Sequence, residues 1–102
     1  LMYAKDDNDD FRHVARCCEK IRQRRLNVAE SYDDWVTVGF SLASAFGERG
    51  REFFHEISMQ SSKYDRTKSD RKYDNFLKTG NGSYTIASLF NLFKENNVFW
   101  YK

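Results

Sequence analysis

Residues 34–46 constrain the fold of this 102-residue chain more than any other segment, because as a helix they are apolar around most of the circumference. At 100° per residue, one arc holds Trp35, Val38, Gly39, Leu42 and Phe46. Val36, Phe40 and Ala43 widen that arc, and the polar side keeps only Thr37, Ser41 and Ser44. Leaving such apolar side chains in water costs roughly 1.5–3 kcal/mol each. We therefore expect a central helix surrounded by other helices.

The ends of this helix are also marked. Ser31 or Asp33 can cap its start, and Gly47 suits a left-handed residue just past its end. Gly39 lies in the middle, where glycine costs about 1 kcal/mol relative to alanine. This cost predicts that a neighbouring helix comes close at that position.

Composition favours a single all-α domain over residues 1–102, a compact bundle of about five short helices. The chain has no proline and five glycines, so helices joined by short turns are expected. Aromatic residues make up 17% of the chain, which is enough to build one core. No apolar run approaches the ~18–20 residues that span a bilayer, and no signal peptide opens the sequence. The expectation is a soluble, cytoplasmic protein with no membrane contact.

The spacing of apolar residues predicts four further helices, over residues 11–26, 49–59, 66–78 and 85–96. Residues 1–10 form an acidic lead-in to the first helix. The third helix packs through Phe53, Phe54 and Ile57, with Arg51 and His55 away from that stripe. Residues 98–102 are predicted as either a short strand or a tail. Since the chain begins with leucine, we expect a segment of a longer protein.

Positive charge is concentrated on two helices. The first helix carries a ladder of basic residues four apart, namely Arg12, Arg16, Lys20 and Arg24. The fourth helix has a basic face formed by Lys68, Arg71, Lys72 and Lys78. Clustered Lys and Arg attract a phosphate backbone, although a solvated helix face looks the same in sequence. The balance of 17 basic against 15 acidic residues argues against strong nonspecific binding to nucleic acid.

The polar loop at residues 60–64 has two interpretations. Tyr64 beside Lys63 can stack on an unpaired base while the ammonium meets phosphate. Alternatively, Tyr64 tucks under the loop and closes it. For the other prominent aromatics the sequence predicts core packing; these are Trp35, Phe46, Phe54, Tyr73 and Phe76.

A series of spaced motifs then carries a resemblance. These motifs are Y-D-D-W-x-x-V-G-x-x-L from Tyr32, F-G-x-x-G-x-x-x-F from Phe46, S-x-x-S-x-K-Y-D from Ser58, K-Y-x-x-F from Lys72 and T-I-x-x-L-F from Thr85. Over roughly residues 30–98 the chain resembles the second type of primase C-terminal domain. Two positions depart from the usual pattern: Tyr73 stands where Trp is common, and Asn97 where Gly often closes the last helix.

The resemblance implies a small helical domain attached to primase or helicase regions of bacterial phage, plasmid and mobile-element proteins, with a role in DNA replication. We expect a non-catalytic accessory domain that weakly contacts single-stranded template DNA or nucleotide. Candidate nucleic-acid-binding residues are Lys63, Tyr64, Arg66, Lys68, Arg71 and Lys72, with Arg49 and Arg51 as lesser candidates. The alternative is a protein-interaction or spacer domain that docks a primase to a helicase, through an apolar patch at Phe99, Trp100 and Tyr101.

Catalytic and cofactor motifs are missing from the sequence. It contains no GxxxxGK[ST], no HExxH and no CxxC. His13 and Cys17 share one polar helical face, but two ligands do not make a metal site. The Asp residues before residue 11 fit charge complementarity with a helix N-terminus better than metal binding. His55 shows no partner acid at fixed spacing, and adjacent Cys17 and Cys18 cannot form an ordinary disulfide. We therefore predict no enzyme activity, cofactor or metal.

Overall fold

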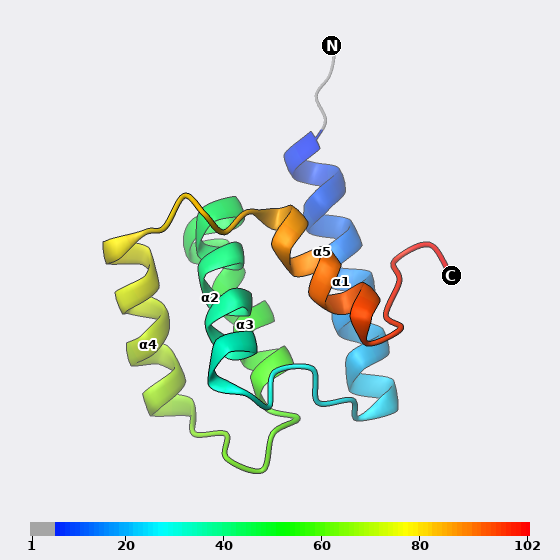
Figure 1. Ribbon diagram of the computed structural model, residues 1–102, viewed down its shortest axis with the longest axis horizontal. Coiled ribbons are helices and arrows are strands. Elements are labelled where there is room, and N and C mark those ends of the chain that lie inside the picture. The colour runs from blue at the N-terminus through cyan, green and yellow to red at the C-terminus, as the bar shows by residue number, and fades with distance from the viewer. Residues whose placement is uncertain (1–5) are drawn as a thin grey trace.

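The computed structural model describes residues 6–102, and their side chains from Asp9 onward. The elements are α1 (Asp6–Arg24), α2 (Tyr32–Phe46), the 3₁₀ turn η1 (Gly47–Gly50), α3 (Arg51–Ser58), α4 (Arg66–Thr79) and α5 (Ile86–Glu95). Figure 1 shows these helices packed side by side with short connections. The predicted all-α bundle of five helices is confirmed.

Helix α2 is the central element, as its nearly uniform apolar surface predicts. It contacts each of the other four α-helices, and Val38 and Leu42 are completely buried. Figure 1 shows α2 with α4 on one side, α1 and α5 on the other, and α3 behind it. A Cβ built at Gly39 would lie 2.0 Å from the Phe76 ring of α4. The predicted close approach at this glycine is therefore confirmed.

The helix ends follow from capping chemistry. Ser31 caps α2 by accepting a hydrogen bond from the Asp34 amide at 3.1 Å, and Asp65 caps α4 by accepting one from the Lys68 amide at 2.9 Å. Gly47 follows α2 with a φ of 59°. Asn97 adopts a φ of 60° after α5, and Val98 N–H donates to the Phe93 carbonyl at 2.8 Å. Asparagine thus takes the left-handed position that glycine often fills.

Three local predictions were wrong. Helix α1 begins at Asp6 rather than Phe11, since aspartates favour the first turns of a helix and nothing breaks the segment. Residues 47–50 form a 3₁₀ turn, so α3 starts at Arg51 instead of residue 49. Ser41 was assigned to a polar side of α2 but is fully buried. Ser44, on the same side, is exposed, so the neighbouring helices cover only part of that side.

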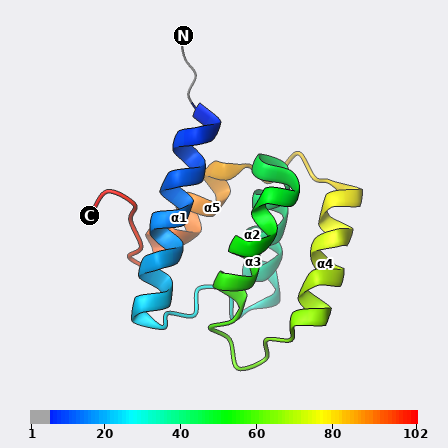
Figure 2. The ribbon, with the colours of Figure 1, turned by 180° about the vertical axis from the view of Figure 1, so that it is seen from behind.

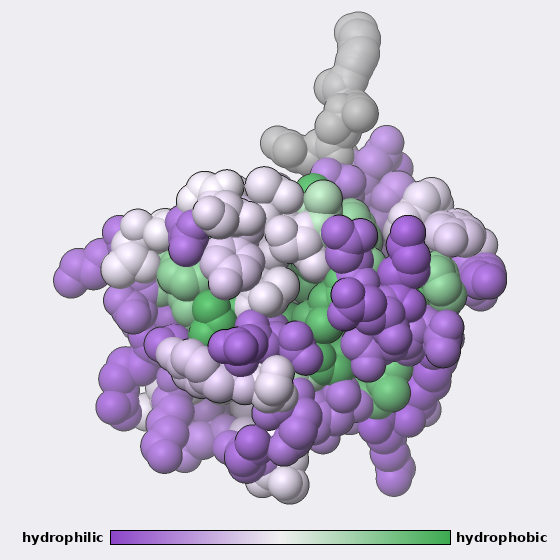
Figure 3. All heavy atoms as spheres, in the orientation of Figure 1, coloured by the Kyte–Doolittle hydropathy of each residue, from purple (hydrophilic) through white to green (hydrophobic). Residues whose placement is uncertain are grey.

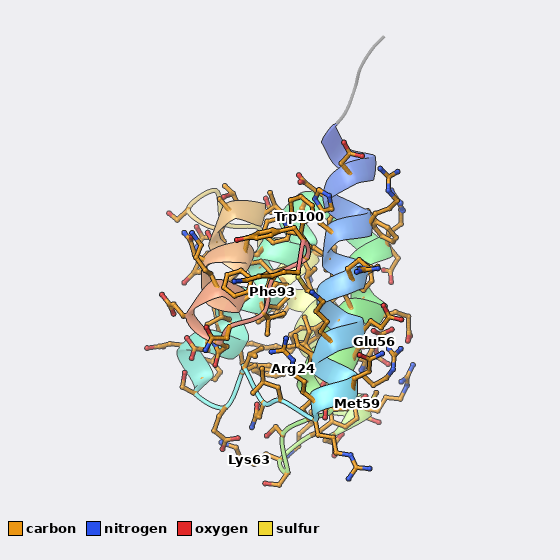
Figure 4. All side chains as sticks on the ribbon, turned by 90° about the vertical axis from the view of Figure 1, so that its right-hand side faces the viewer. Arg24, Glu56, Met59, Lys63, Phe93 and Trp100 are labelled. Carbon is orange, nitrogen blue, oxygen red and sulfur yellow. The ribbon has the colours of Figure 1, made fainter. Side chains whose placement is uncertain are left out.

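Residues 98–102 form a tail that packs against α1. The Trp100 ring stacks on His13 with centroids 3.6 Å apart, and Arg24 donates to the Asn97 carbonyl at 2.9 Å. Lys20 donates to the Phe99 carbonyl. In Figure 4, Trp100 lies next to α1 and above Phe93 of α5. Of the two alternatives left open for this segment, the structure shows the tail.

The tail explains a further correction on α1. Cys17 was placed on a polar face with His13, yet it is fully buried. It shares a helical face with His13, Lys20 and Arg24, which all meet the tail or the residue before it. Figure 2 shows α1 from the other side, packed against α3. The helix is therefore covered over a wider arc than its own apolar stripe indicates.

One face of the molecule is mainly hydrophilic. On the face in Figure 3, polar and charged side chains surround a smaller area of hydrophobic atoms. Within residues 6–102, no helix combines the length and the apolar character that crossing a bilayer requires.

Candidate nucleic-acid interface

A cleft of about 230 Å³ opens at the end of the bundle where α2 and α4 begin. Its walls include three aromatic side chains, those of Tyr32, Trp35 and Tyr64. Lys63 and Lys68 also line it. Figure 4 shows Lys63 at this end of the molecule, below the helices. The cleft therefore combines aromatic rings with two lysines and with two acids, Glu30 and Asp65. Rings beside cations suit single-stranded nucleic acid.

Trp35 is held rigidly in the cleft wall. Its ring stacks on Phe54 of α3 with centroids 5.3 Å apart and an interplanar angle of 27°. Its indole Nε1 donates to Ser58 Oγ at 2.8 Å. Because both the ring and its polar edge are satisfied within the protein, the orientation of Trp35 does not depend on a ligand.

Tyr64 is anchored through a buried histidine. Its hydroxyl lies 2.7 Å from His55 Nδ1, and His55 Nε2 lies 2.6 Å from Asp70 Oδ1. Since an ionised carboxylate only accepts hydrogen bonds, His55 Nε2 donates to Asp70, and in the neutral tautomer that this requires Nδ1 accepts from the Tyr64 hydroxyl. The Tyr64 hydroxyl thus turns toward the core, while its ring lines the cleft. This geometry orients a ring; it does not present an exposed nucleophile.

A cluster of charges extends the His55 chain across α3 and α4. Arg51 donates to the Asp70 carboxylate at 3.2 Å and to its backbone carbonyl at 3.1 Å. It also pairs with Glu48 and Asp74. The hydrogen bond from His55, with a smaller contribution from Arg51, lowers the pKa of Asp70 below its usual value. Arg51 is therefore committed to joining helices, although the sequence made it a lesser DNA-binding candidate.

Lys63 is tethered to the segment before α2. Its Nζ lies 3.1 Å from a carboxylate oxygen of Glu30 and 3.3 Å from the Glu30 carbonyl. The hydrogen bond from Lys63, followed by one from Asn27, lowers the pKa of the Glu30 carboxyl. Both side chains of this pair are more than half exposed, so the pair is weak and Lys63 can exchange Glu30 for a phosphate oxygen at little cost.

Helix α4 divides the remaining candidates between different faces. Lys68 and Lys72 are four residues apart and face the start of α2, where Lys72 Nζ donates to the Tyr32 hydroxyl at 2.8 Å. Arg66 lies on the α3 side of the helix and contacts Glu52 at 3.3 Å. Arg71 is exposed, and its position on the helix points away from the buried face. The structure therefore gathers Lys63, Tyr64 and Lys68 at the cleft, with Lys72 beside it.

Other basic residues are engaged elsewhere in the bundle. Arg49, a lesser candidate, lies over the Phe11 ring with 4.2 Å between the guanidinium carbon and the ring centroid. On α1, Arg12 pairs with Asp9, and Arg22 lies 3.5 Å from Glu56. Two members of the α1 ladder, Lys20 and Arg24, donate to carbonyls at the start of the tail. Half of that ladder thus has a structural role.

The sequence interpretation missed the residue that organises the cleft. His55 was placed away from the buried stripe of α3, but it is fully buried. The sequence shows no partner acid at fixed spacing from His55, and the structure supplies one from another helix, Asp70 of α4. Its two partners are 9 and 15 residues away along the chain and lie outside α3. No periodicity within one helix can indicate such a contact.

No group of three or more potential metal ligands occurs among the residues that the structure describes. His13 stacks on Trp100, and burial raises the pKa of Cys17 to about 11, which disfavours the thiolate that metals bind. The side chains of Asp6 and Asp7 lie outside the part of the chain whose side chains the structure describes.

Comparison with known proteins gives a family. The family model described as Primase C terminal 2 (PriCT-2) matches residues 18–92, from within α1 to within α5. Neither the curated proteins nor the solved structures include a match to this chain. The matched region is most of the 102 residues and includes every residue that lines the cleft. This agrees with the resemblance found in the motifs between Tyr32 and Phe90. The chain therefore belongs to the Primase C terminal 2 family, as a primase-associated C-terminal domain.

Proposed function

We propose that this domain is a non-catalytic accessory module of a DNA-replication primase or primase-helicase, and that it weakly holds single-stranded template DNA. The observation that carries the proposal is the cleft where α2 and α4 begin, with Lys63 and Lys68 beside the exposed ring of Tyr32 and the half-buried rings of Trp35 and Tyr64. Lysines meet phosphates without reading sequence, and stacking on rings tolerates every base. Membership in a primase-associated family supports the choice of DNA as the ligand.

Weak binding follows from the charge distribution. Glu30 and Asp65 also line the cleft, and the formal net charge of the chain is only +2. A catalytic region of the same primase or helicase would hold the strand nearby, which raises its effective concentration at the cleft. The domain then needs little intrinsic affinity to position a template.

The first experiment is a fluorescence-anisotropy titration of a labelled single-stranded oligonucleotide, at several salt concentrations. Saturable binding with a linear log–log salt dependence is expected, since phosphate contacts release counterions. The double variant Lys68→Glu/Lys72→Glu should bind much more weakly. Its salt slope should fall by about 0.7 for each contact removed.

A matched control separates the site from bulk charge. Lys78→Glu/Lys94→Glu reverses two exposed lysines at the far end of α4 and at the end of α5, with the same change in net charge. This control should keep most of the affinity. Equal losses in both double variants, or no binding by the wild-type chain at low salt, would refute a site at the cleft.

A second candidate function is a docking module between primase and helicase regions without DNA contact. The observation in its favour is the tail, where Trp100 is 38% exposed and Tyr101 is 61% exposed. Sedimentation at rising concentration, with and without residues 98–102, tests this candidate. Self-association that disappears with the tail would support it, and a monomer in both cases would count against it.

A further inference from the structure

We infer that the cleft seats one unstacked base of the strand against Trp35 and Tyr64, and that the buried His55–Asp70 pair holds the Tyr64 ring in place for it. This inference rests on the proposed function, because it adds a base-binding site to the phosphate contacts. It also gives His55 a positioning role at a distance from the ligand.

The size of the cleft limits its occupant. At about 230 Å³ it lies below the range of roughly 300–1,000 Å³ that is usual for drug-sized ligands. A stacked run of several bases does not fit such a volume, whereas one planar ring system does. The lining also includes the small residues Ala29 and Ser69.

The chemistry of the walls suits a base better than an apolar peptide side chain. Trp35 and Tyr64 offer ring surfaces, while Ser31 and Ser61 add hydroxyl groups at the cleft. A base has both a flat face for stacking and a polar edge for hydrogen bonds, so it uses both kinds of group. Lys63 and Lys68 provide positive charge for the phosphates that flank it.

The His55 contacts make the site rigid before a ligand arrives. His55 is fully buried, and its two ring nitrogens are bonded to Tyr64 and Asp70 at 2.7 and 2.6 Å. Tyr64 follows a loop with backbone turns at Ser61 and Tyr64, and its hydroxyl ties the end of that loop to α3. A ring fixed in this way loses little conformational entropy on binding, which favours affinity.

The test uses the 102-residue chain and two oligonucleotide probes. The first probe carries 2-aminopurine, whose fluorescence reports whether a base stacks on an aromatic ring. The second has the same length and phosphates but contains only abasic sugars. Quenching of 2-aminopurine on binding, and an affinity for the abasic strand about 5- to 100-fold below that for normal DNA, are expected.

Variants locate the effect at the cleft. Tyr64→Leu should lose the same 5- to 100-fold in affinity for normal DNA, yet keep its salt slope, since it removes a ring and no charge. Tyr64→Phe keeps the ring but removes the hydroxyl that bonds to His55, so it should lose affinity, although less than Tyr64→Leu. The matched control is Tyr101→Leu, because Tyr101 is an exposed ring on the tail. Circular dichroism checks that each variant is folded.

The outcomes separate the inference from the proposed function. Equal affinity for normal and abasic strands, with unchanged 2-aminopurine fluorescence, would overturn the base site while leaving phosphate binding intact. Wild-type affinity in Tyr64→Phe would overturn the positioning role of His55, and wild-type affinity in Tyr64→Leu would overturn stacking on Tyr64. If neither strand binds, the proposed function itself fails. The probe measurements on the wild-type chain keep the inference testable even if a variant does not fold.

Discussion

At Gly39, the contact between α2 and α4 leaves no room for a side chain. An added Cβ would lie 2.0–2.8 Å from three atoms of the Phe76 ring, which is itself buried. Alanine would improve helix propensity by about 1 kcal/mol, but overpacking of a core typically costs 1–3 kcal/mol or more. The steric effect wins, because the aromatic ring has no open space to move into.

We therefore expect Gly39→Ala to lower the free energy of unfolding by about 1–3 kcal/mol, measured by urea denaturation. The matched control is Gly82→Ala, since a Cβ there meets nothing within 4 Å. It should leave the urea midpoint nearly unchanged. A Gly39→Ala variant as stable as the wild type would contradict the close approach.

Asp70 gives the stability of the domain a pH dependence. Its pKa is lower in the folded chain than in the unfolded chain, mainly because His55 donates a hydrogen bond to it. The stabilisation is therefore fully present above the ordinary Asp pKa of 3.8 and is lost as the pH falls through the lower, folded value.

Asp70→Asn should be less stable than the wild type at pH 7, and the difference should close as the pH falls below the ordinary pKa of aspartate. Urea midpoints at a series of pH values measure this. Glu95→Gln is the control, because Glu95 is an exposed acid at the end of α5, away from His55. A stability gap that stayed constant down to low pH would show that Asp70 acts through shape alone.

Among the elements, α1 depends on the tail for part of its anchoring. The stack of Trp100 on His13 and the hydrogen bonds from Lys20 and Arg24 hold residues 97–100 along one face of the helix. Aromatic pairs contribute about 0.5–1.5 kcal/mol beyond the area they bury. The tail is thus a structural part of the bundle and not a loose end.

A double-mutant cycle measures that contribution. Trp100→Ala and His13→Ala should each lower the free energy of unfolding, and the double variant should lose less than the sum of both. The expected coupling energy is about 0.5–1.5 kcal/mol. Strictly additive losses would mean that the two rings do not stabilise each other.

The helices themselves were predictable, whereas the contacts between them were only partly so. Apolar residues at helical spacing show which faces of a helix are buried. Most faces of α2 are apolar, so its central position could be predicted. A capping residue acts locally, and Ser31 was one of the two candidates that the sequence offers for the start of α2. His55 and Cys17 were misplaced because a loop, a second helix and the tail cover them, and these partners lie far along the chain.

On the scale of the whole molecule, the cleft and the tail lie on different sides. The cleft lies where α2 and α4 begin, and the tail lies along α1 on the opposite flank from α4 (Figure 1). Strand binding and tail docking should therefore be separable. Trp100→Ala should leave the affinity for single-stranded DNA unchanged at a temperature where the variant is folded. A loss comparable to that of Lys68→Glu/Lys72→Glu would place the tail in the DNA path.

The two buried cysteines of α1 can report local opening of the structure. Cys17 and Cys18 are buried, and burial raises the pKa of both thiols, so alkylating reagents meet neither an accessible nor an ionised sulfur. Cys17 lies toward the tail. Cys18 lies toward α3, where Glu56 and Arg22 are its charged neighbours. Each thiol is released by a different local opening, one when the tail detaches and the other when α1 leaves α3. The order in which reagent modifies them would therefore reveal which side of the molecule comes apart first.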